Sequence, residues 1–357
     1  MYLEQIKTLA RECGFELAGV TAAAPVPEAD YYRQWVADGF AAEMSYLTGR
    51  RADLRDDPRR LLPSARSILC VGKLYNGPQP YSTEFNGDEL GWISRYAWGD
   101  DYHEVLKKGL LRLVDRLRTR IVEPFEWKIC VDTAPLLERA LARHAGLGWI
   151  AKNTCLINQG MGSWFFLGEL LLSLDCEPSQ PAPDRCGTCT RCIDACPTQA
   201  IVPTGRREGP AYALDSRLCI SYFTIELRGA VPEPVRTGIG RHVFGCDICQ
   251  DVCPWNRRAP STGEPALAAA HFAPPLEKLA KLSEGEFRNL FRHSAIERAR
   301  YTGFLRNVAI AMGNSRRSEF RAPLEQLSLL PDAVVAESAR WGLARLMPPA
   351  RPQCTRS

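Results

Sequence analysis

The chain has 357 residues, a hydrophobic content of 45% and a formal net charge of only +4 at pH 7. This size and composition predict two or three domains with substantial hydrophobic cores. The longest apolar stretch, residues 164–174, contains Glu169 and is too short to cross a bilayer, and the N-terminus is acidic and amphipathic, so we expect neither a membrane-spanning nor a secreted chain.

The first region, residues 1 to about 178, mixes helical and extended patterns. Apolar residues at positions 6, 9, 10 and 13 recur at the spacing of one helix face, and a long amphipathic helix is predicted over Tyr102–Ile121. Short apolar runs predict strands over Glu16–Thr21, Ser67–Leu74, Trp127–Asp132 and Phe165–Leu174. Because strands and helices do not alternate regularly enough for a doubly wound sheet, an α+β fold is favoured over α/β.

A proline-rich linker at residues 177–183 precedes a region dense in cysteine, which extends to about Pro260. Its two runs, C-x2-C-x2-C-x3-C-P and C-x2-C-x3-C-P, have the spacing of paired iron–sulfur clusters, in which the cysteine before proline ligates the other cluster. This rule predicts one cluster on Cys186, Cys189, Cys192 and Cys253. The second cluster takes Cys196, Cys246 and Cys249, and Cys219 is predicted to be its fourth ligand.

Other uses of these cysteines fit less well. A disulfide framework is typical of small secreted chains, and a four-cysteine zinc site usually shows two separated C-x2-C pairs. We therefore favour two 4Fe-4S clusters over zinc or disulfides, and oxygen-sensitive clusters predict a cytoplasmic protein. The cysteines without ligand spacing are Cys13, Cys70, Cys130, Cys155, Cys176 and Cys354, of which Cys70 and Cys130 are best explained as small buried hydrophobic residues.

The C-terminal region follows a second linker at residues 261–275 and is predicted to be wholly helical from Leu276 onward. Residues 304–314 and 334–344 resemble helices of a stacked repeat, with room for only about two helix pairs. Between residues 276 and 321 there are ten Lys or Arg and five Glu. This excess is either a phosphate-binding face or a solvated helix surface, and charge alone favours neither.

The first region also contains glycine-rich polar and aromatic stretches, whereas it has no G-x-G-x-x-G after a strand, no P-loop and no H-E-x-x-H. A nicotinamide dehydrogenase or a nucleotide hydrolase is therefore unsupported. Glycines that allow close backbone approach, beside aromatic residues and a few charges, suit a large flat cofactor. The stretches are 93–103, 131–139, 146–154 and 162–169.

Together with the cysteine runs, residues 219–222 and the motif Ile296-Glu297-Arg298 through Leu305-Arg306-Asn307, these stretches resemble the epoxyqueuosine reductase family nearly end to end. The resemblance implies a nitroreductase-like cobalamin-binding domain (1–178), a ferredoxin-like domain with two 4Fe-4S clusters (179–262) and a helical HEAT-like tRNA-binding domain (263–357). It implies reduction of epoxyqueuosine to queuosine at the wobble position of a tRNA with a GUN anticodon. A low-potential flavodoxin- or ferredoxin-type electron donor and a monomer without membrane contact are also implied.

The resemblance carries roles to individual residues. Asp132 matches the family's acid, and to donate a proton its pKa would be raised by burial; the alternative is that Asp132 caps a helix that opens at Pro135. His103 is predicted to belong to a helix start and not to ligate cobalt. Glu297 departs from the family, which commonly has a basic residue there. The implied cofactor-binding residues are Arg55, Arg95, Tyr96, Tyr102, Asp132, Lys152, Asn153, Leu156 and Ser221, and the implied tRNA-binding residues are Arg298, Arg306 and Asn307.

Two rival functions remain. A reductive dehalogenase shares cobalamin and two clusters, but it predicts a twin-arginine export signal and no basic helical C-terminus, which is the reverse of this sequence. A non-enzymatic electron carrier would use the clusters and dock a protein partner on the helices. That function leaves Asp132 and the glycine–aromatic stretches unexplained.

Overall fold

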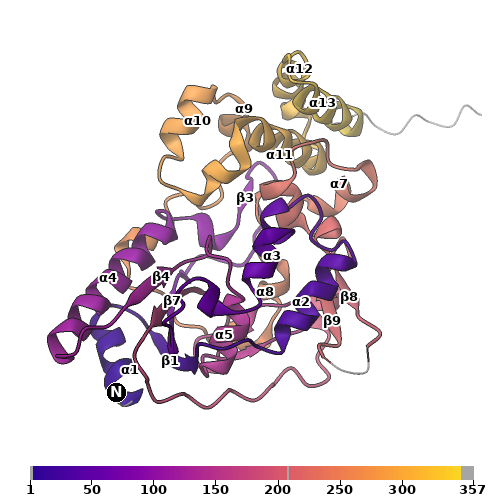
Figure 1. Cartoon of the computed structure of the whole chain (residues 1–357). Helices are drawn as coiled ribbons and strands as arrows, with labels where there is room; N and C mark the ends of the chain where they lie inside the picture. Colours follow the sequence, from indigo (N-terminus) through magenta and orange to yellow (C-terminus); the bar gives the residue numbers. More distant parts are fainter. Residues whose placement is uncertain (1–2, 207–208, 347–357) are drawn as a thin grey trace, which may run out of the picture.

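A computed structural model describes residues 3–206 and 209–346 of the protein. Its largest sheet has the strand order β1-β2-β7-β4, and each neighbouring pair is antiparallel. This sheet lies at one end of the molecule, and the C-terminal helices lie at the other end (Figure 1).

The elements follow one another along the chain with long connections between them. The strands are β1 (Leu17–Ala22), β2 (Ser67–Leu74), β3 (Trp92–Ile93), β4 (Trp127–Cys130), β5 (Trp149–Ile150), β6 (Leu156–Ile157), β7 (Phe165–Leu172), β8 (Ile201–Pro203), β9 (Tyr212–Leu214) and β10 (His242–Phe244). The helices are α1 (Leu3–Glu12), α2 (Glu28–Ala37), α3 (Arg50–Leu54), α4 (Tyr102–Arg120), α5 (Glu138–His144), α6 (Arg191–Asp194), α7 (Glu233–Ile239), α8 (Ile248–Asp251), α9 (Leu276–Ala280), α10 (Glu284–Leu290), α11 (Arg300–Ser315), α12 (Arg321–Ser328) and α13 (Ala333–Leu346).

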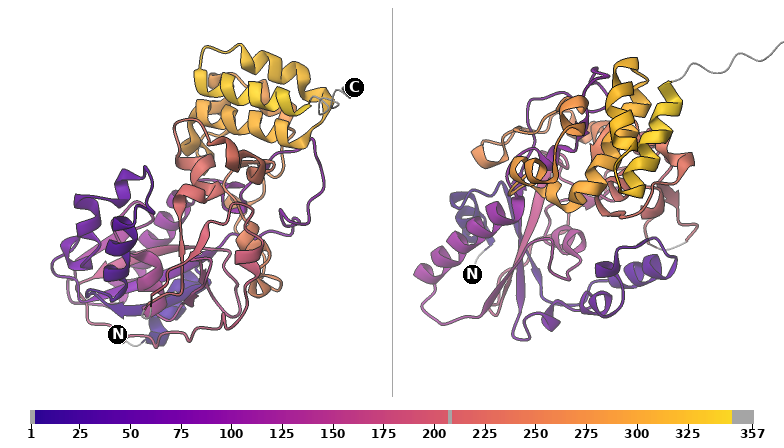
Figure 2. Two further views of the ribbon diagram at one scale, coloured as in Figure 1. Left: turned by 90° about the vertical axis from the view of Figure 1, so that its right-hand side faces the viewer. Right: turned by 90° about the horizontal axis from the view of Figure 1, so that it is seen from above.

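Helices cover both faces of the sheet, as a view from above shows (Figure 2). Side chains of a strand alternate between the two faces, so β2 contributes to two cores. Leu69 and Val71 pack with α1 and α4, whereas Ile68 and Cys70 pack with α5. Every residue of β2 is therefore buried, which explains its unbroken apolar run.

The sequence-predicted elements of this region are confirmed with small shifts at their ends. The predicted helix over Tyr102–Ile121 is α4, which begins where the Asp101 side chain accepts a hydrogen bond from the backbone N–H of His103. The predicted strand over Trp127–Asp132 ends at Cys130. From there the chain leaves the sheet and turns into the loop that carries Asp132.

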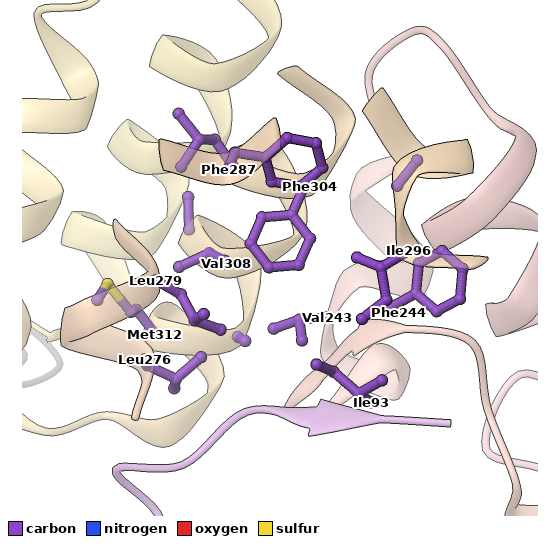
Figure 3. Packing of buried hydrophobic residues seen from close by; sticks show 14 of the residues in the cluster. Ile93, Val243, Phe244, Leu276, Leu279, Phe287, Ile296, Phe304, Val308 and Met312 are labelled. Carbon is purple, nitrogen blue, oxygen red and sulfur yellow. The ribbon is translucent and has the colours of Figure 1, made fainter. Parts of the chain in front are cut away.

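The cysteine-rich region consists mainly of loops with short elements between α6 and α8. The C-terminal region is helical from α9 to α13, as predicted, and α11 lies at its centre with most of its side chains buried. Figure 3 shows Phe287, Phe304 and Val308 packed together there. Among the described residues, no helix is both long and apolar enough to traverse a lipid bilayer.

A segment of the first region also belongs to this C-terminal core. We call residues 76–101, which connect β2 to α4, the strap. β3 in the strap pairs in parallel with β10, and Trp92 and Trp98 lie edge-on to Phe272 with ring centroids 5.8 and 5.1 Å away. The strap thus crosses the predicted boundaries at residues 178 and 262, and the three regions share one core.

Candidate active site

Asp132 lies in the loop between β4 and α5, and its backbone has a φ of +51°. This left-handed conformation is uncommon for residues other than glycine, although aspartate tolerates it better than most. The Asp132 N–H donates to Oε1 of Glu138 at 2.6 Å, and the Asp132 side chain is 46% exposed. The alternative prediction of a helix cap is wrong, because α5 begins only at Glu138 and Leu137 occupies the cap position.

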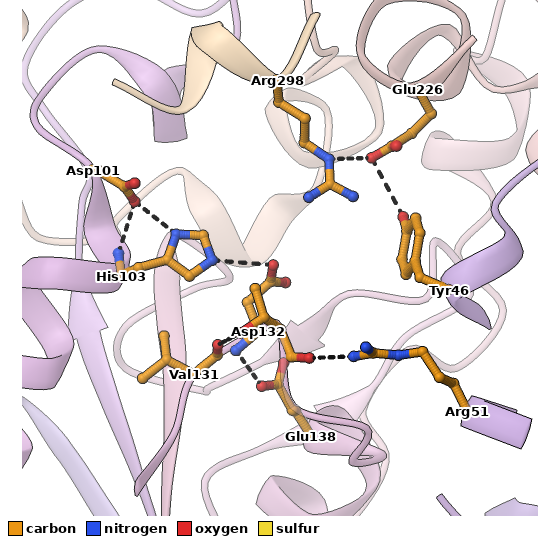
Figure 4. A network of polar contacts seen from close by, with 10 residues as sticks. Tyr46, Arg51, Asp101, His103, Val131, Asp132, Glu138, Glu226 and Arg298 are labelled. Atoms are coloured by element: carbon orange, nitrogen blue, oxygen red, sulfur yellow. Dashed lines mark hydrogen bonds and ion pairs between the residues drawn. The ribbon is translucent and has the colours of Figure 1, made fainter. Parts of the chain in front are cut away.

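His103, in the first turn of α4, connects two carboxylates. Its Nδ1 lies 2.6 Å from Oδ1 of Asp101, and its Nε2 lies 3.3 Å from Oδ2 of Asp132. Asp101 also caps the helix, so the same carboxylate that starts α4 fixes the imidazole ring. The predicted place of His103 at a helix start is confirmed, and Figure 4 shows its ring pointing at Asp132.

The charges of this chain of groups place its proton on the histidine. Hydrogen bonds to Asp101 and then to Asp132 raise the pKa of His103 to about 9. Burial pushes the pKa of Asp132 upward, but the hydrogen bond and charge of His103, the charge of Arg298 and a hydrogen bond from Tyr102 together hold it below its ordinary value. In the protein alone, burial is thus outweighed by nearby cations and donors, and a raised Asp132 pKa beside a bound corrin stays a prediction.

A second polar group, with one member from each of the three regions, faces Asp132 (Figure 4). Arg298 Nε donates to Oε1 of Glu226 at 2.6 Å, and the Tyr46 hydroxyl donates to the same oxygen at 3.3 Å. The Arg298 guanidinium also lies over the Tyr46 ring, 5.1 Å from its centroid. Arg51 donates to the carbonyl of Thr133 at 2.7 Å and so holds the Asp132 loop from the side of α3.

Aromatic side chains pack against these polar groups. Tyr102 stacks on Phe166 with ring centroids 4.3 Å apart, and on the His103 ring at 4.2 Å. Tyr96 lies edge-on to Tyr102 at 6.2 Å. Burial raises the pKa of both tyrosines, so each keeps its hydroxyl proton, and Tyr102 hydrogen bonds to Asp132. The structure thus brings the predicted residues Tyr96, Tyr102 and Asp132 together.

The comparisons with known proteins point in one direction. The epoxyqueuosine reductase QueG family model matches residues 55–133, and a 4Fe-4S double cluster binding domain matches residues 185–256. Curated proteins named epoxyqueuosine reductase from Xanthomonas campestris and Pseudomonas aeruginosa are 42% and 39% identical to this chain. Each alignment covers 96% of this chain, and 95% and 94% of those relatives.

The chain belongs to the epoxyqueuosine reductase family.

Solved structures of the family share its fold. A crystal structure of an epoxyqueuosine reductase with an epoxyqueuosine-modified tRNA stem loop is 29% identical, with a TM-score of 0.85, and the match covers 96% of this chain and 89% of that one. A Bacillus subtilis family structure, also 29% identical with a TM-score of 0.85, covers 97% of this chain and 91% of that one. Its catalytic aspartate loop is described as swung out of the active site.

The cysteines predicted to bind the clusters lie close enough to affect one another's pKa. Burial, followed by the charges of Cys253, Cys186 and Cys189, raises the pKa of Cys192 to about 11. Burial and then the charges of Cys219 and Cys196 raise the pKa of Cys246. A hydrogen bond with Cys155 is the largest cause of the raised pKa of Cys249, followed by burial and the charges of Cys155, Cys246 and Cys219. The thiols of each predicted group therefore lie near one another, with Cys155 beside Cys249 as a further thiol, although no three ligand-type side chains among the described residues converge as closely as a single metal ion requires.

Two predicted cofactor-binding arginines have other partners in this epoxyqueuosine reductase fold. The Arg95 guanidinium is buried and donates to the carbonyls of Gly77, Gln79 and Pro80. Arg55 is also buried and donates to the carbonyls of Tyr46 and Arg51. We therefore correct the prediction for both residues: Arg95 shapes the strap, and Arg55 shapes the loop that carries Tyr46.

The remaining predicted cofactor residues lie between the sheet and the cysteine-rich loops. Lys152 donates to the carbonyls of Gly187 and Cys189, and the buried Asn153 amide donates to the carbonyl of Cys249. Both therefore hold cluster loops in place, and cofactor contact by either residue stays a prediction. Leu156 is buried in the core beside α5, and Ser221 hydrogen bonds to the predicted cluster ligand Cys219.

The predicted tRNA-binding motif divides into two parts. Arg298 reaches the opening above Asp132, and its side chain is 40% exposed. Arg306 and Asn307 are buried in α11, where Arg306 donates to the carbonyls of Leu227, Gly229 and Phe223. Direct tRNA contact by Arg306 and Asn307 is contradicted by this burial, since their polar atoms are already bonded inside the protein.

Sequence reasoning missed Tyr46, Glu138 and Glu226 as parts of the site. Glu138 followed Asp132 within a selected stretch, yet nothing in that stretch indicated that it would bind the Asp132 backbone. Tyr46 and Glu226 come from different regions, so their meeting depends on tertiary structure. A charged residue in a buried strand is a usable signal, and Glu169 was such a case.

Proposed function

We propose that this chain reduces epoxyqueuosine to queuosine at the wobble position of tRNA. The observation that carries the proposal is the Asp101–His103–Asp132 chain, which presents a half-exposed carboxyl under groups from all three regions. Membership of the epoxyqueuosine reductase family supplies the substrate class. Removing the epoxide oxygen as water consumes two electrons and two protons, so the site must deliver both.

The residues fit the cofactors that the family implies. Two groups of neighbouring thiols suit two 4Fe-4S clusters, one held by Cys186, Cys189, Cys192 and Cys253, the other by Cys196, Cys219, Cys246 and Cys249. Cobalamin would lie beside Asp132, against Tyr96 and Tyr102, where the carboxyl is open and the rings offer an apolar surface. When bound, these groups supply low-potential electrons to the epoxide carbon.

The protein supplies the protons. Near neutral pH His103 carries a proton and lies 3.3 Å from Asp132, which can relay that proton to the developing alkoxide; solvent then reprotonates the imidazole, and the same relay delivers the second proton. Asp132 therefore acts as donor only in combination with His103. In the Bacillus subtilis relative the corresponding catalytic loop is described as swung out of the active site, and we propose that the Asp132 loop of this chain can move in the same way.

For tRNA we propose a surface that begins at Arg298 and continues into a groove of about 450 Å³ at the start of α11. Arg228, Arg288 and Arg300 line this groove together with Glu284 and Glu297. Arg288 is paired with Glu284 at 2.5 Å, so Arg300 is the cation most available to a phosphate. The modified base would leave its stack to reach Asp132, since a stacked base is not accessible.

We also propose that the chain contains the three domains that the family resemblance implies. The sheet region would be the nitroreductase-like cobalamin-binding domain, the cysteine-rich loops the ferredoxin-like domain, and α9 to α13 the HEAT-like tRNA-binding domain. A cytoplasmic monomer supplied by a flavodoxin- or ferredoxin-type donor completes the proposal.

The test is reconstitution of the protein with iron, sulfide and cobalamin, followed by incubation with epoxyqueuosine-containing tRNA and a low-potential reductant. Nucleoside analysis should show queuosine. Protein loaded with clusters and cobalamin that forms no queuosine would overturn the proposal. Cluster absorbance with no cobalamin band after supplementation would instead favour the electron carrier, and family membership over 96% of the chain already disfavours a dehalogenase.

A further inference from the structure

A pair of glutamates, Glu169 fully buried and Glu138 half-buried, lies behind the Asp132 loop. Glu169 is in β7, is fully buried, and neither of its carboxyl oxygens has a conventional hydrogen-bond donor in the described structure. Its neighbours across the sheet are Cys70 in β2 and Cys130 in β4. Burial raises the pKa of both thiols, so they stay neutral, and a thiol has no cationic form that could offset the charge of Glu169.

Glu138, the first residue of α5, covers Glu169 from the helix side. Its Oε1 accepts the hydrogen bond from the Asp132 N–H at 2.6 Å, and the two glutamate carboxyls lie within hydrogen-bonding reach of each other. Two ionised carboxylates cannot hydrogen bond to each other, since both only accept. The contact therefore requires a proton on one of them.

The charges around the pair lead to the same conclusion. Asp132, on the loop, is a further anion facing both glutamates. Arg139 is the nearby cation, but its guanidinium is directed to Thr154, with a bond of 2.5 Å to the carbonyl. Burial, together with this excess of negative charge, raises the pKa of both glutamates, with Glu169 the more strongly affected.

We propose that Glu138 and Glu169 share a single proton and together form a positioning pair that holds the Asp132 loop in its inward, left-handed conformation. Glu169 keeps the proton and donates a hydrogen bond to Glu138. Glu138 then presents its other oxygen, with the pair's remaining negative charge, to the Asp132 N–H. This inference rests on the proposed function only for its consequence, which is correct placement of the Asp132 carboxyl; the shared proton and the loop contact are independent of the reaction.

The shared proton is tested by infrared difference spectroscopy of the full-length protein and Glu169→Gln. A glutamine amide can donate to Glu138 as the protonated acid does, but it has no acid carbonyl band. We expect the difference spectrum near neutral pH to show the loss of a protonated-carboxyl band that shifts in D2O. Glu325→Gln, on the exposed face of α12, is the control and should leave the band unchanged. An unchanged band in Glu169→Gln would overturn the proposal.

The loop contact is tested by hydrogen exchange of the peptide that contains residues 131–137. Protection should be similar to wild type in Glu169→Gln, which preserves the donor to Glu138. It should fall in Glu169→Leu, which removes that donor, and in Glu138→Ala, which removes the acceptor of the Asp132 N–H. If Glu169→Leu does not fold, Glu138→Ala alone decides. Unchanged protection in Glu138→Ala would contradict the role in positioning.

Turnover supplies the third measurement. We expect Glu138→Ala to lose about 100-fold in single-turnover rate, with binding of tRNA unchanged, because a displaced acid loses its alignment with the substrate. Glu169→Gln should retain most of the rate. If wild type itself makes no queuosine, the proposed function fails while the spectroscopic and exchange results still judge the glutamate pair.

Discussion

Arg298 and Arg306 come from the same predicted motif, yet the regions that they occupy have opposite characters. Around Arg298, polar groups from three regions surround a half-exposed carboxyl, and partners are shared between residues. Around Arg306, the guanidinium is fully buried and its donors are bonded to backbone carbonyls and to Asn307. We call the second region the α11 hub, comprising Arg306, Asn307 and Asn314. The difference shows that one basic motif can contain both an exposed arginine beside the candidate site and a buried arginine that holds the structure together.

The α11 hub fastens the C-terminal helices to the cysteine-rich region. Asn307 donates to the carbonyls of Thr224 and Val243, and Asn314 donates to those of Arg236 and Gly240. Each bond satisfies a backbone carbonyl that would otherwise be buried without a donor. Hub residues should therefore control stability, and residues near Asp132 should control turnover.

The largest effect is expected from Arg306→Met, which keeps the apolar stem and removes the guanidinium. Several buried carbonyls lose their donor at once, so we expect a loss of about 3–5 kcal/mol in folding stability. The yield of soluble protein and the midpoint of thermal unfolding measure it. A folded variant with normal stability and weakened tRNA binding would reverse the assignment of Arg306 to the hub.

Asp132→Ala should have the next largest effect, on the turnover rate and not on folding stability. Loss of the donor should reduce the single-turnover rate by about 10²–10⁴-fold. Thermal stability should change little, because the side chain is 46% exposed. Cofactor loading and tRNA binding serve as controls, and unimpaired turnover would remove Asp132 from the mechanism.

The turnover rate should depend on pH through the titration of His103, which belongs to the site and not to the α11 hub. The pKa of His103 is raised to about 9, so the imidazolium persists at neutral pH and is lost as the pH rises through about 9. The rate should fall across that range in wild type. Any stability contributed by the charged ring is fully present below the unfolded histidine pKa, about 6.5, and disappears over the same rise.

His103→Asn is the matched variant for this measurement. It should be slower at neutral pH and should lack the decline near pH 9. A decline that survives unchanged in His103→Asn would assign that titration to another group.

Arg298→Gln should give the smallest effect. If Arg298 meets a tRNA phosphate, affinity should fall modestly, and the slope of log affinity against log salt should decrease by about one. Arg321→Gln, an exposed arginine of the same basic stretch, is the control. Equal effects of the two variants would mean that Arg298 contributes only general charge.

Much of the architecture could be predicted because it is encoded locally. The unbroken apolar run of β2 and the spacing of Leu106, Leu110 and Leu113 in α4 each indicate one element and its buried face. The cysteine spacing likewise indicates cluster binding, since short steps between thiols reflect the size of a cluster. These predictions needed no knowledge of distant contacts.

The arrangement of the site could not be predicted in the same way. The burial of Arg95 and Arg306 depends on which carbonyls the tertiary fold leaves without donors, and those carbonyls belong to remote segments. The lowered pKa of Asp132 likewise depends on two distant residues. His103 lies 29 positions earlier in the chain, and Arg298 lies in the C-terminal region. The pattern of charge and hydropathy along the sequence does not determine such tertiary contacts.

The strap has a consequence for how the protein is made. Trp92 and Trp98 are synthesised early, but their packing partners Phe272 and Phe244 come more than 140 residues later. During synthesis the indole rings of this segment therefore stay unpacked until Phe244 and Phe272 have been made. Shortened chains that end before Phe244 would keep those rings exposed and should aggregate, so the protein cannot be assembled from its regions one at a time.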